Sequence, residues 1–179
     1  GAPIAGSSGP ISFGLQTTAG TYTVEATNVA TSCTNTMTGS VTVTSTPLPT
    51  TFTVTGGGNY CSGGTGVTVS LNGSESGVNY QLYRGATAVG APMAGTGSAL
   101  SFGLQTIAGS YTVGAVNGTT GCTLNMAGSA NVAINPLPSQ FTVTGGGGYC
   151  NGGTGVAVGL SGSVVGFTYQ LWLSTTLVD

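Results

Sequence analysis

The sequence predicts an all-β chain built from two-sheet sandwiches of about seven strands, one for each 89-residue repeat. The first observation is the repeat itself: 52 of the 89 residue pairs between 1–89 and 90–178 are identical, at a constant offset of 89. The second is that apolar residues alternate with period two inside short runs. The third is that glycine-rich breaks separate these runs. A unit of this length is close to the ~100 residues of a small β-sandwich.

The first strands of the repeat are predicted from alternating runs that follow Pro47-Leu48-Pro49. Within 67–71, for example, Val67, Val69 and Leu71 project to one face, and threonine and serine occupy the other. The Gly56-Gly57-Gly58 string predicts a break between strands. The predicted strands of this half are 52–55, 67–71 and 78–84, with an edge strand at 86–89.

The later strands are predicted at 99–102, 110–116 and 129–134, again with alternating apolar residues. Tyr111 follows a turn at the start of the second of these strands. An apolar residue, a turn and then a tyrosine at the start of a strand are how immunoglobulin-like sandwiches make their tyrosine corner. The same pattern also fits an ordinary buried strand tyrosine, and both interpretations agree with a sandwich fold.

The repeat divides the chain into three segments. The N-terminal segment (1–46) is predicted to be the C-terminal half of a module, and the C-terminal segment (136–179) the N-terminal half of another. The central segment (47–135) is predicted to be a whole module. Pro47-Leu48-Pro49 and Pro136-Leu137-Pro138 are predicted to be short, semi-rigid joints, because proline fixes the backbone and cannot donate to a ladder.

The composition argues against several function classes. Only 2% of the residues are charged, with one arginine, no lysine and no histidine, so the chain lacks the clustered cations that neutralise nucleic-acid phosphates. No apolar run approaches the ~18 residues of a membrane span. Glu25 and Glu75 are not part of the repeat pattern and form no catalytic pair. We therefore expect no enzyme activity, cofactor, metal ion or nucleic-acid partner.

Four strings carry a resemblance to a known family: Phe52 to Cys61, Tyr80 to Tyr83, Gly109 to Val113, and Gly121-Cys122. Together they resemble the bacterial immunoglobulin-like tandem repeats of large secreted or cell-surface proteins, including adhesin-like proteins of gliding bacteria. The resemblance implies an immunoglobulin-like sandwich, an extracellular or cell-surface location, and a role in stalks, attachment or matrix. It transfers no catalytic residue.

Each repeat contains two cysteines, which predicts a disulfide between Cys61 and Cys122 within the central module. Closing a loop of about 60 residues would stabilise the module by roughly 4 kcal/mol in the chain-entropy model. A metal site or a reactive thiol is the alternative. Cys33 and Cys150 are predicted to pair with cysteines of neighbouring copies.

The complementary half-modules predict a head-to-tail filament. The C-terminal half of one chain and the N-terminal half of the next would complete one module, between separate chains or within a longer polypeptide. The expected partner is therefore the protein itself. Covalent glycans are a second expectation, on exposed threonine or serine or on the acceptor sequences at Asn72 and Asn117.

The alternative function is an adhesive binding module. Threonine alternates through 42–46 and 51–55, as it does on ice-binding and some carbohydrate-binding sheets. Threonine is also an ordinary residue for the wet face of a strand. Tyr83 and Trp172 occupy equivalent positions and could stack against a sugar, although a core or an interface also accommodates such residues.

Overall fold

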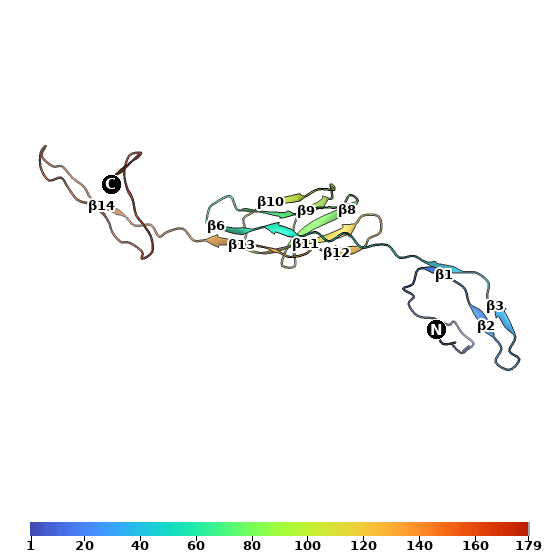
Figure 1. Ribbon diagram of the computed structural model, residues 1–179. Coiled ribbons are helices and arrows are strands. Elements are labelled where there is room, and N and C mark those ends of the chain that lie inside the picture. Colours follow the sequence, from blue (N-terminus) through green and yellow to red (C-terminus); the bar gives the residue numbers. More distant parts are fainter. Residues whose placement is uncertain (179) are drawn as a thin grey trace.

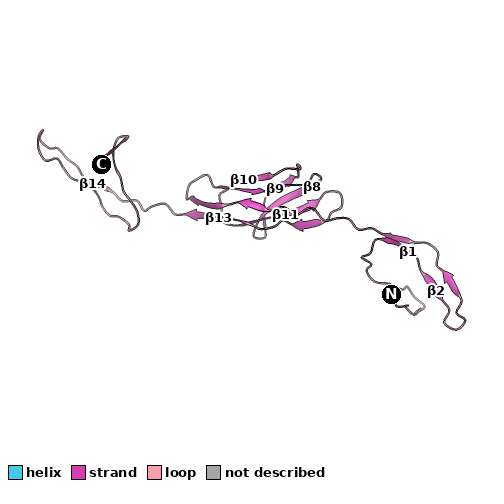
Figure 2. Ribbon diagram, in the orientation of Figure 1, coloured by secondary structure: helices cyan, strands magenta, loops and turns pink. Residues whose placement is uncertain are grey.

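The computed structural model describes residues 1–178, in which every regular element is a β-strand and no helix occurs (Figure 2). The predicted all-β class is confirmed. Figure 1 shows a compact central segment between two open flanking segments.

The strands fall into three groups along the chain. The N-terminal segment contains β1 (Gly20–Tyr22), β2 (Glu25–Thr27), β3 (Thr34–Thr36) and β4 (Val41–Val43). The central segment contains β5 (Val54–Gly56), β6 (Gly58–Cys61), β7 (Val67–Leu71), β8 (Val78–Arg84), β9 (Thr87–Ala94), β10 (Leu100–Gln105), β11 (Gly109–Asn117), β12 (Thr123–Asn125) and β13 (Ala130–Asn135). The C-terminal segment contains β14 (Val143–Gly145), β15 (Val158–Leu160), β16 (Leu171–Leu173) and β17 (Thr176–Val178).

The central segment has two sheets that share one core. One has the order β10-β7-β5, and the other β6-β13-β11-β8-β9, with β12 paired to β11. Alternate residues of each strand point into the core, as the period-two pattern predicts. Phe52 packs edge-on against Tyr80, with ring centroids 6.4 Å apart. The fully buried large side chains are Tyr80, Tyr111, Leu71, Leu82, Val69, Val78, Val113 and Val132.

The central segment has nine strands, not the predicted seven, because β6 and β12 are short strands that carry no clear alternation. The glycines at 56–58 do more than break a strand. They carry the chain from β5 in the smaller sheet to β6 in the larger sheet, where β6 runs parallel to β13. Gly56 has φ +89° and a Cβ there would collide with the Thr68 carbonyl oxygen, so the crossing requires glycine.

Tyr111 is anchored to the backbone just upstream of its strand. Its buried hydroxyl donates a hydrogen bond of 2.8 Å to the Ile107 carbonyl oxygen, four residues upstream. Tyr22, the equivalent residue in the N-terminal segment, makes the same 2.8 Å bond to the Thr18 carbonyl.

We expect Tyr111→Phe to lower the free energy of unfolding of the central segment by about 1–2 kcal/mol. The change removes the hydroxyl donor and leaves the Ile107 carbonyl oxygen without this hydrogen bond. Denaturant unfolding monitored by backbone circular dichroism measures the loss. Tyr22→Phe is the matched control, and an equally large effect on the same transition would contradict the assignment.

Candidate assembly surfaces

The flanking segments keep the local strand pairs of the central segment. The hairpin β14–β15 has the register Val143↔Leu160, which is the register Val54↔Leu71 of β5–β7 moved by 89 residues. The same holds for β16–β17 against β8–β9, for β1–β4 against β11–β13, and for β2–β3 against β11–β12. Each flanking segment is therefore organised like the corresponding part of the central segment.

The pairs that the flanking segments lack are those that join the two halves of the repeat. In the central segment these joining pairs are β7–β10, β8–β11 and β6–β13. The C-terminal segment contains the equivalents of β6, β7 and β8, and the N-terminal segment the equivalents of β10, β11 and β13. Each segment thus has unpaired backbone donors and acceptors that match those of the other.

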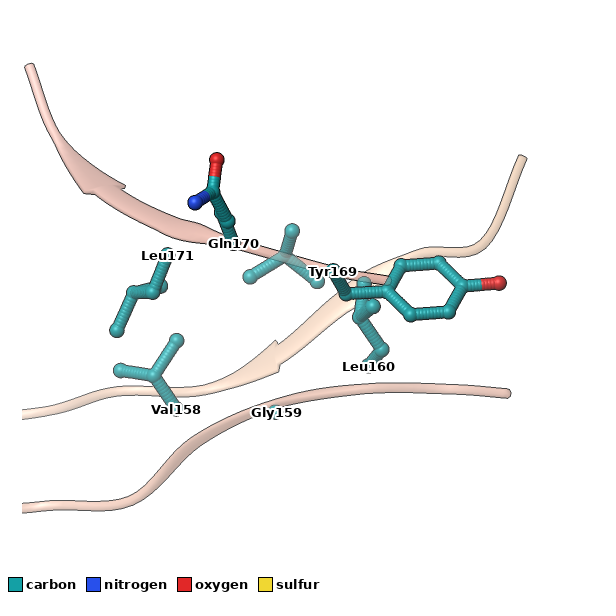
Figure 3. A pocket seen from close by; sticks show the side chains of 7 residues that line it. Val158, Gly159, Leu160, Tyr169, Gln170 and Leu171 are labelled. Atoms are coloured by element: carbon teal, nitrogen blue, oxygen red, sulfur yellow. The ribbon is translucent and has the colours of Figure 1, made fainter. Parts of the chain in front are cut away.

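The C-terminal segment has an open apolar groove of about 440 Å³ (Figure 3). Figure 3 shows Leu160 beside the Tyr169 ring and Val158 facing Leu171 further along the groove, with the Gln170 amide pointing away from them. Val158, Leu160 and Tyr169 are 50%, 39% and 41% exposed, whereas their central equivalents Val69, Leu71 and Tyr80 are 0% exposed. The groove is the half-core that the central segment covers with its later strands.

The N-terminal segment exposes the other half of this core. Its exposed apolar residues correspond to central residues that are buried on β10, β11, β13 and the turn before β13. The exposed fractions are 43% for Ile11, 39% for Val24, 40% for Met37 and 67% for Val41. The sequence analysis predicted the half-modules but did not identify these core residues as a candidate assembly surface, although the repeat offset identifies each of them.

The cysteines do not follow the predicted pairing. All four are free thiols in the structure. Cys61 ends β6 and is paired with Asn135 on β13. Val132 of β13 is paired with Gly109, the first residue of β11, so Cys61 lies three residues beyond the start of β11. Cys122 lies opposite Asn117, at the far end of β11.

These registers place Cys61 and Cys122 at opposite ends of the larger sheet. At ~3.3 Å per residue the two are separated by roughly 35 Å, whereas the Cα atoms of a disulfide lie about 4.4–6.8 Å apart. The predicted Cys61–Cys122 bond within the module is therefore wrong for this topology. The equivalent pairing of Cys150 with the Cys33 of a neighbouring copy, inside one composite module, meets the same obstacle.

Cys122 lies beside the segment boundary. Its sulfur is 3.1 Å from the Oγ1 atom of Thr46, near the end of the N-terminal segment. Hydrogen bonds from the Thr120 side chain, and then from Thr46, hold the pKa of the Cys122 thiol below its ordinary value. Such bonds favour the thiolate, which is the reactive form of cysteine.

We expect the alkylation rate of Cys122 to reach half of its maximum at a higher pH in Thr120→Val than in the unchanged chain. Removing the hydroxyl removes a bond that stabilises the thiolate, so the thiol pKa rises. Thr46→Val is expected to raise the midpoint less. Peptide mass spectrometry after timed iodoacetamide labelling gives the rate at each pH. Thr154→Val, an exposed change in the C-terminal segment, is the control and should leave the midpoint unchanged.

The two asparagines of the glycan-acceptor sequences make backbone contacts. Asn72 accepts a 2.8 Å hydrogen bond from the Thr53 N–H, and the third residue of its sequence, Ser74, is only 4% exposed. Asn117 accepts bonds from the Thr119 and Thr120 N–H groups, which form its turn. Glycosylation at both asparagines stays a prediction, and the burial of Ser74 disfavours Asn72.

The residues predicted to stack against a sugar are not brought together. Tyr83 lines a hollow of about 430 Å³ over Gly114 and Leu124 in the central segment. Trp172 is 56% exposed on β16 of the C-terminal segment. The threonine runs at 42–46 and 51–55 also lie in different segments, in β4 and β5 and the residues beside them.

Over residues 1–178, no three histidine, cysteine, aspartate or glutamate side chains gather in a group that could hold a metal ion. The same residues contain no helix of the length and hydropathy needed to span a membrane. No known protein family, curated protein or solved structure matches the chain.

Proposed function

We propose that the protein is a structural filament or stalk, in which immunoglobulin-like modules follow one another head to tail. The C-terminal segment of one copy and the N-terminal segment of the next combine into a module like the central one. The same composite module forms where further repeats continue one polypeptide. In both cases the partner is this sequence itself.

The observation that carries the proposal is the match between the two open segments. The apolar groove around Val158 and Tyr169 is the half-core that the strands after it cover in the central segment. Each missing strand pair would combine one strand of the C-terminal segment with one strand of the N-terminal segment. Combining the segments buries apolar area and pairs exposed strand edges, the two main sources of affinity in strand complementation.

A head-to-tail contact does not close on itself, so the product is an open fibre. The two sheets with their tyrosine corner at Tyr111 are consistent with an immunoglobulin-like module. The low charge of the chain favours association. A location outside a bacterial cell or on its surface is part of the proposal and is supported by the sequence resemblance.

Negative-stain electron microscopy of the purified chain tests the assembly. We expect unbranched filaments with an axial repeat of two modules for each copy. Denaturing electrophoresis with reductant of the native protein separates the two routes: a band at the 17.3 kDa of this chain indicates complementation between copies, and a much larger species indicates one long polypeptide. Monodisperse particles of one chain at high concentration would contradict assembly between copies.

A further inference from the structure

The two cysteines of the central module lie at its two joints. The chain enters this module beside β12 and leaves it at the end of β13 (Figure 1). Cys122 is at the entry end, because it lies opposite Asn117 and its sulfur touches Thr46. Cys61 is at the exit end, because its Cα atom is paired with that of Asn135, the last residue of β13.

Thr46 and Asn135 are equivalent residues, 89 positions apart. The entry and the exit of the central module are therefore two copies of the same joint. The exit shows the contacts of the joint with the preceding module, and the entry shows its contacts with the following module. At the exit, Asn135 has Cys61 of its own module as its neighbour on β6, at the ~4.8 Å spacing of adjacent strands. At the entry, Thr46 has Cys122 of the following module 3.1 Å away.

Superposing Asn135 at the exit on its equivalent Thr46 at the entry brings the two cysteines together. Paired residues of adjacent strands project to the same face of a sheet, so the side chain of Cys61 points to the side that Asn135 points to. In a complete preceding module, the equivalent of Cys61 would lie on the side of Thr46 that faces the Cys122 sulfur. We propose that Cys61 of each module forms a disulfide bond with the Cys122 equivalent of the next module.

At the entry joint the chain is held against the central module. Pro49 is buried, and the Thr50 N–H donates a 3.0 Å hydrogen bond to Glu75 Oε2 of the central module. The offset of 89 residues is the same on both sides of each joint, so every joint has the same length. The bond uses both cysteines of each repeat, one toward the preceding module and one toward the following module.

The oxidant is a disulfide donor, either a small-molecule disulfide or a thiol–disulfide oxidoreductase. The Cys122 thiolate attacks the donor, forms a mixed disulfide and releases one donor thiol. The Cys61 thiolate of the preceding module then displaces the second donor thiol and completes the bond. The donor disulfide is reduced to two thiols, and the two cysteines are oxidised. The product restrains bending at the joint and links neighbouring modules covalently.

The test uses the full chain lengthened by one repeat, with residues 91–179 added again after Asp179 in register. This polypeptide contains a complete joint and does not need assembly between copies, so its result is independent of the proposed filament. A joint variant keeps only Cys61 and the second copy of Cys122. A module variant keeps only Cys61 and the first Cys122. All other cysteines are serine in both variants.

After incubation with oxidised glutathione, we expect the joint variant to lose both thiols in an intrachain bond and the module variant to keep them. Intact mass after alkylation under non-reducing, denaturing conditions counts the thiols, and circular dichroism confirms that both variants are folded. Closure of the module variant, or two folded variants that both stay reduced, would overturn the proposal.

Disulfide mapping of the unchanged chain gives a second measurement. In head-to-tail copies the joint bonds link Cys61 to Cys33 of the next copy, and Cys150 to Cys122 of the next copy. Peptides that link Cys61 to Cys122, or Cys150 to Cys33, would overturn the proposal even if filaments form.

Discussion

Val158→Asp is expected to weaken assembly roughly a hundredfold while the central module stays folded. Val158 is half exposed in the C-terminal groove, and its equivalent Val69 is completely buried. The composite module would therefore have to bury a carboxylate without a partner, which costs at least about 3 kcal/mol. A loss of this size weakens association roughly a hundredfold. Sedimentation velocity across a concentration series measures the change.

Val165→Asp is the matched control for this experiment. Val165 is 100% exposed in the same segment, and the central module has the exposed Ser76 at the equivalent position. We expect this variant to assemble as the unchanged chain does. Assembly of Val158→Asp at the unchanged concentration would show that the groove is not the contact surface.

Leu71→Ala is expected to destabilise the central module by about 2–5 kcal/mol, because it removes a fully buried side chain and leaves a cavity. Leu71 pairs with both Val54 and Leu100, so the cavity opens in the middle of the smaller sheet. Urea unfolding of the chain at a concentration below assembly measures the loss. A shift of less than about 1 kcal/mol would contradict the assigned core.

Leu160→Ala makes the same change at the equivalent position of the open segment. Leu160 is 39% exposed, so the free energy of unfolding of the unassembled chain should hardly change. In filaments the same substitution should cost as much as Leu71→Ala, because the composite module buries the side chain. An equal effect of Leu160→Ala with and without assembly would contradict the composite core.

Several strands of the central module could be predicted from the sequence. The strands at 67–71 and 78–84 have the predicted bounds, because alternating apolar residues between turn residues specify a strand with one buried face. The parallel partner strand β6 could not be predicted, since Tyr60 and Cys61 carry no alternation and their partner β13 is distant in the sequence. The error on the cysteines follows from this, because the pairing with Asn135 places Cys61 at the exit.

The candidate assembly surface was predictable in outline and not in detail. The repeat offset indicated that residues 1–46 and 136–179 are unlike halves. It did not show that the groove around Leu160 and Tyr169 is already shaped by local hairpins, or that Thr46 touches Cys122. These depend on side-chain packing and on the path of the chain at the joint, which spacing alone does not specify.

The repeat offset is read directly from the sequence. The alternating faces and the strand pairs inside each flanking segment also follow from the sequence, since they need only residues of the same segment. The identical strings at 12–17 and 101–106 show what the tertiary structure decides. Residues 101–105 belong to strand β10, where β7 pairs with them, whereas residues 12–16 form no strand. The same residues become a strand only beside a partner, because a single strand leaves its backbone groups unpaired and its apolar face exposed.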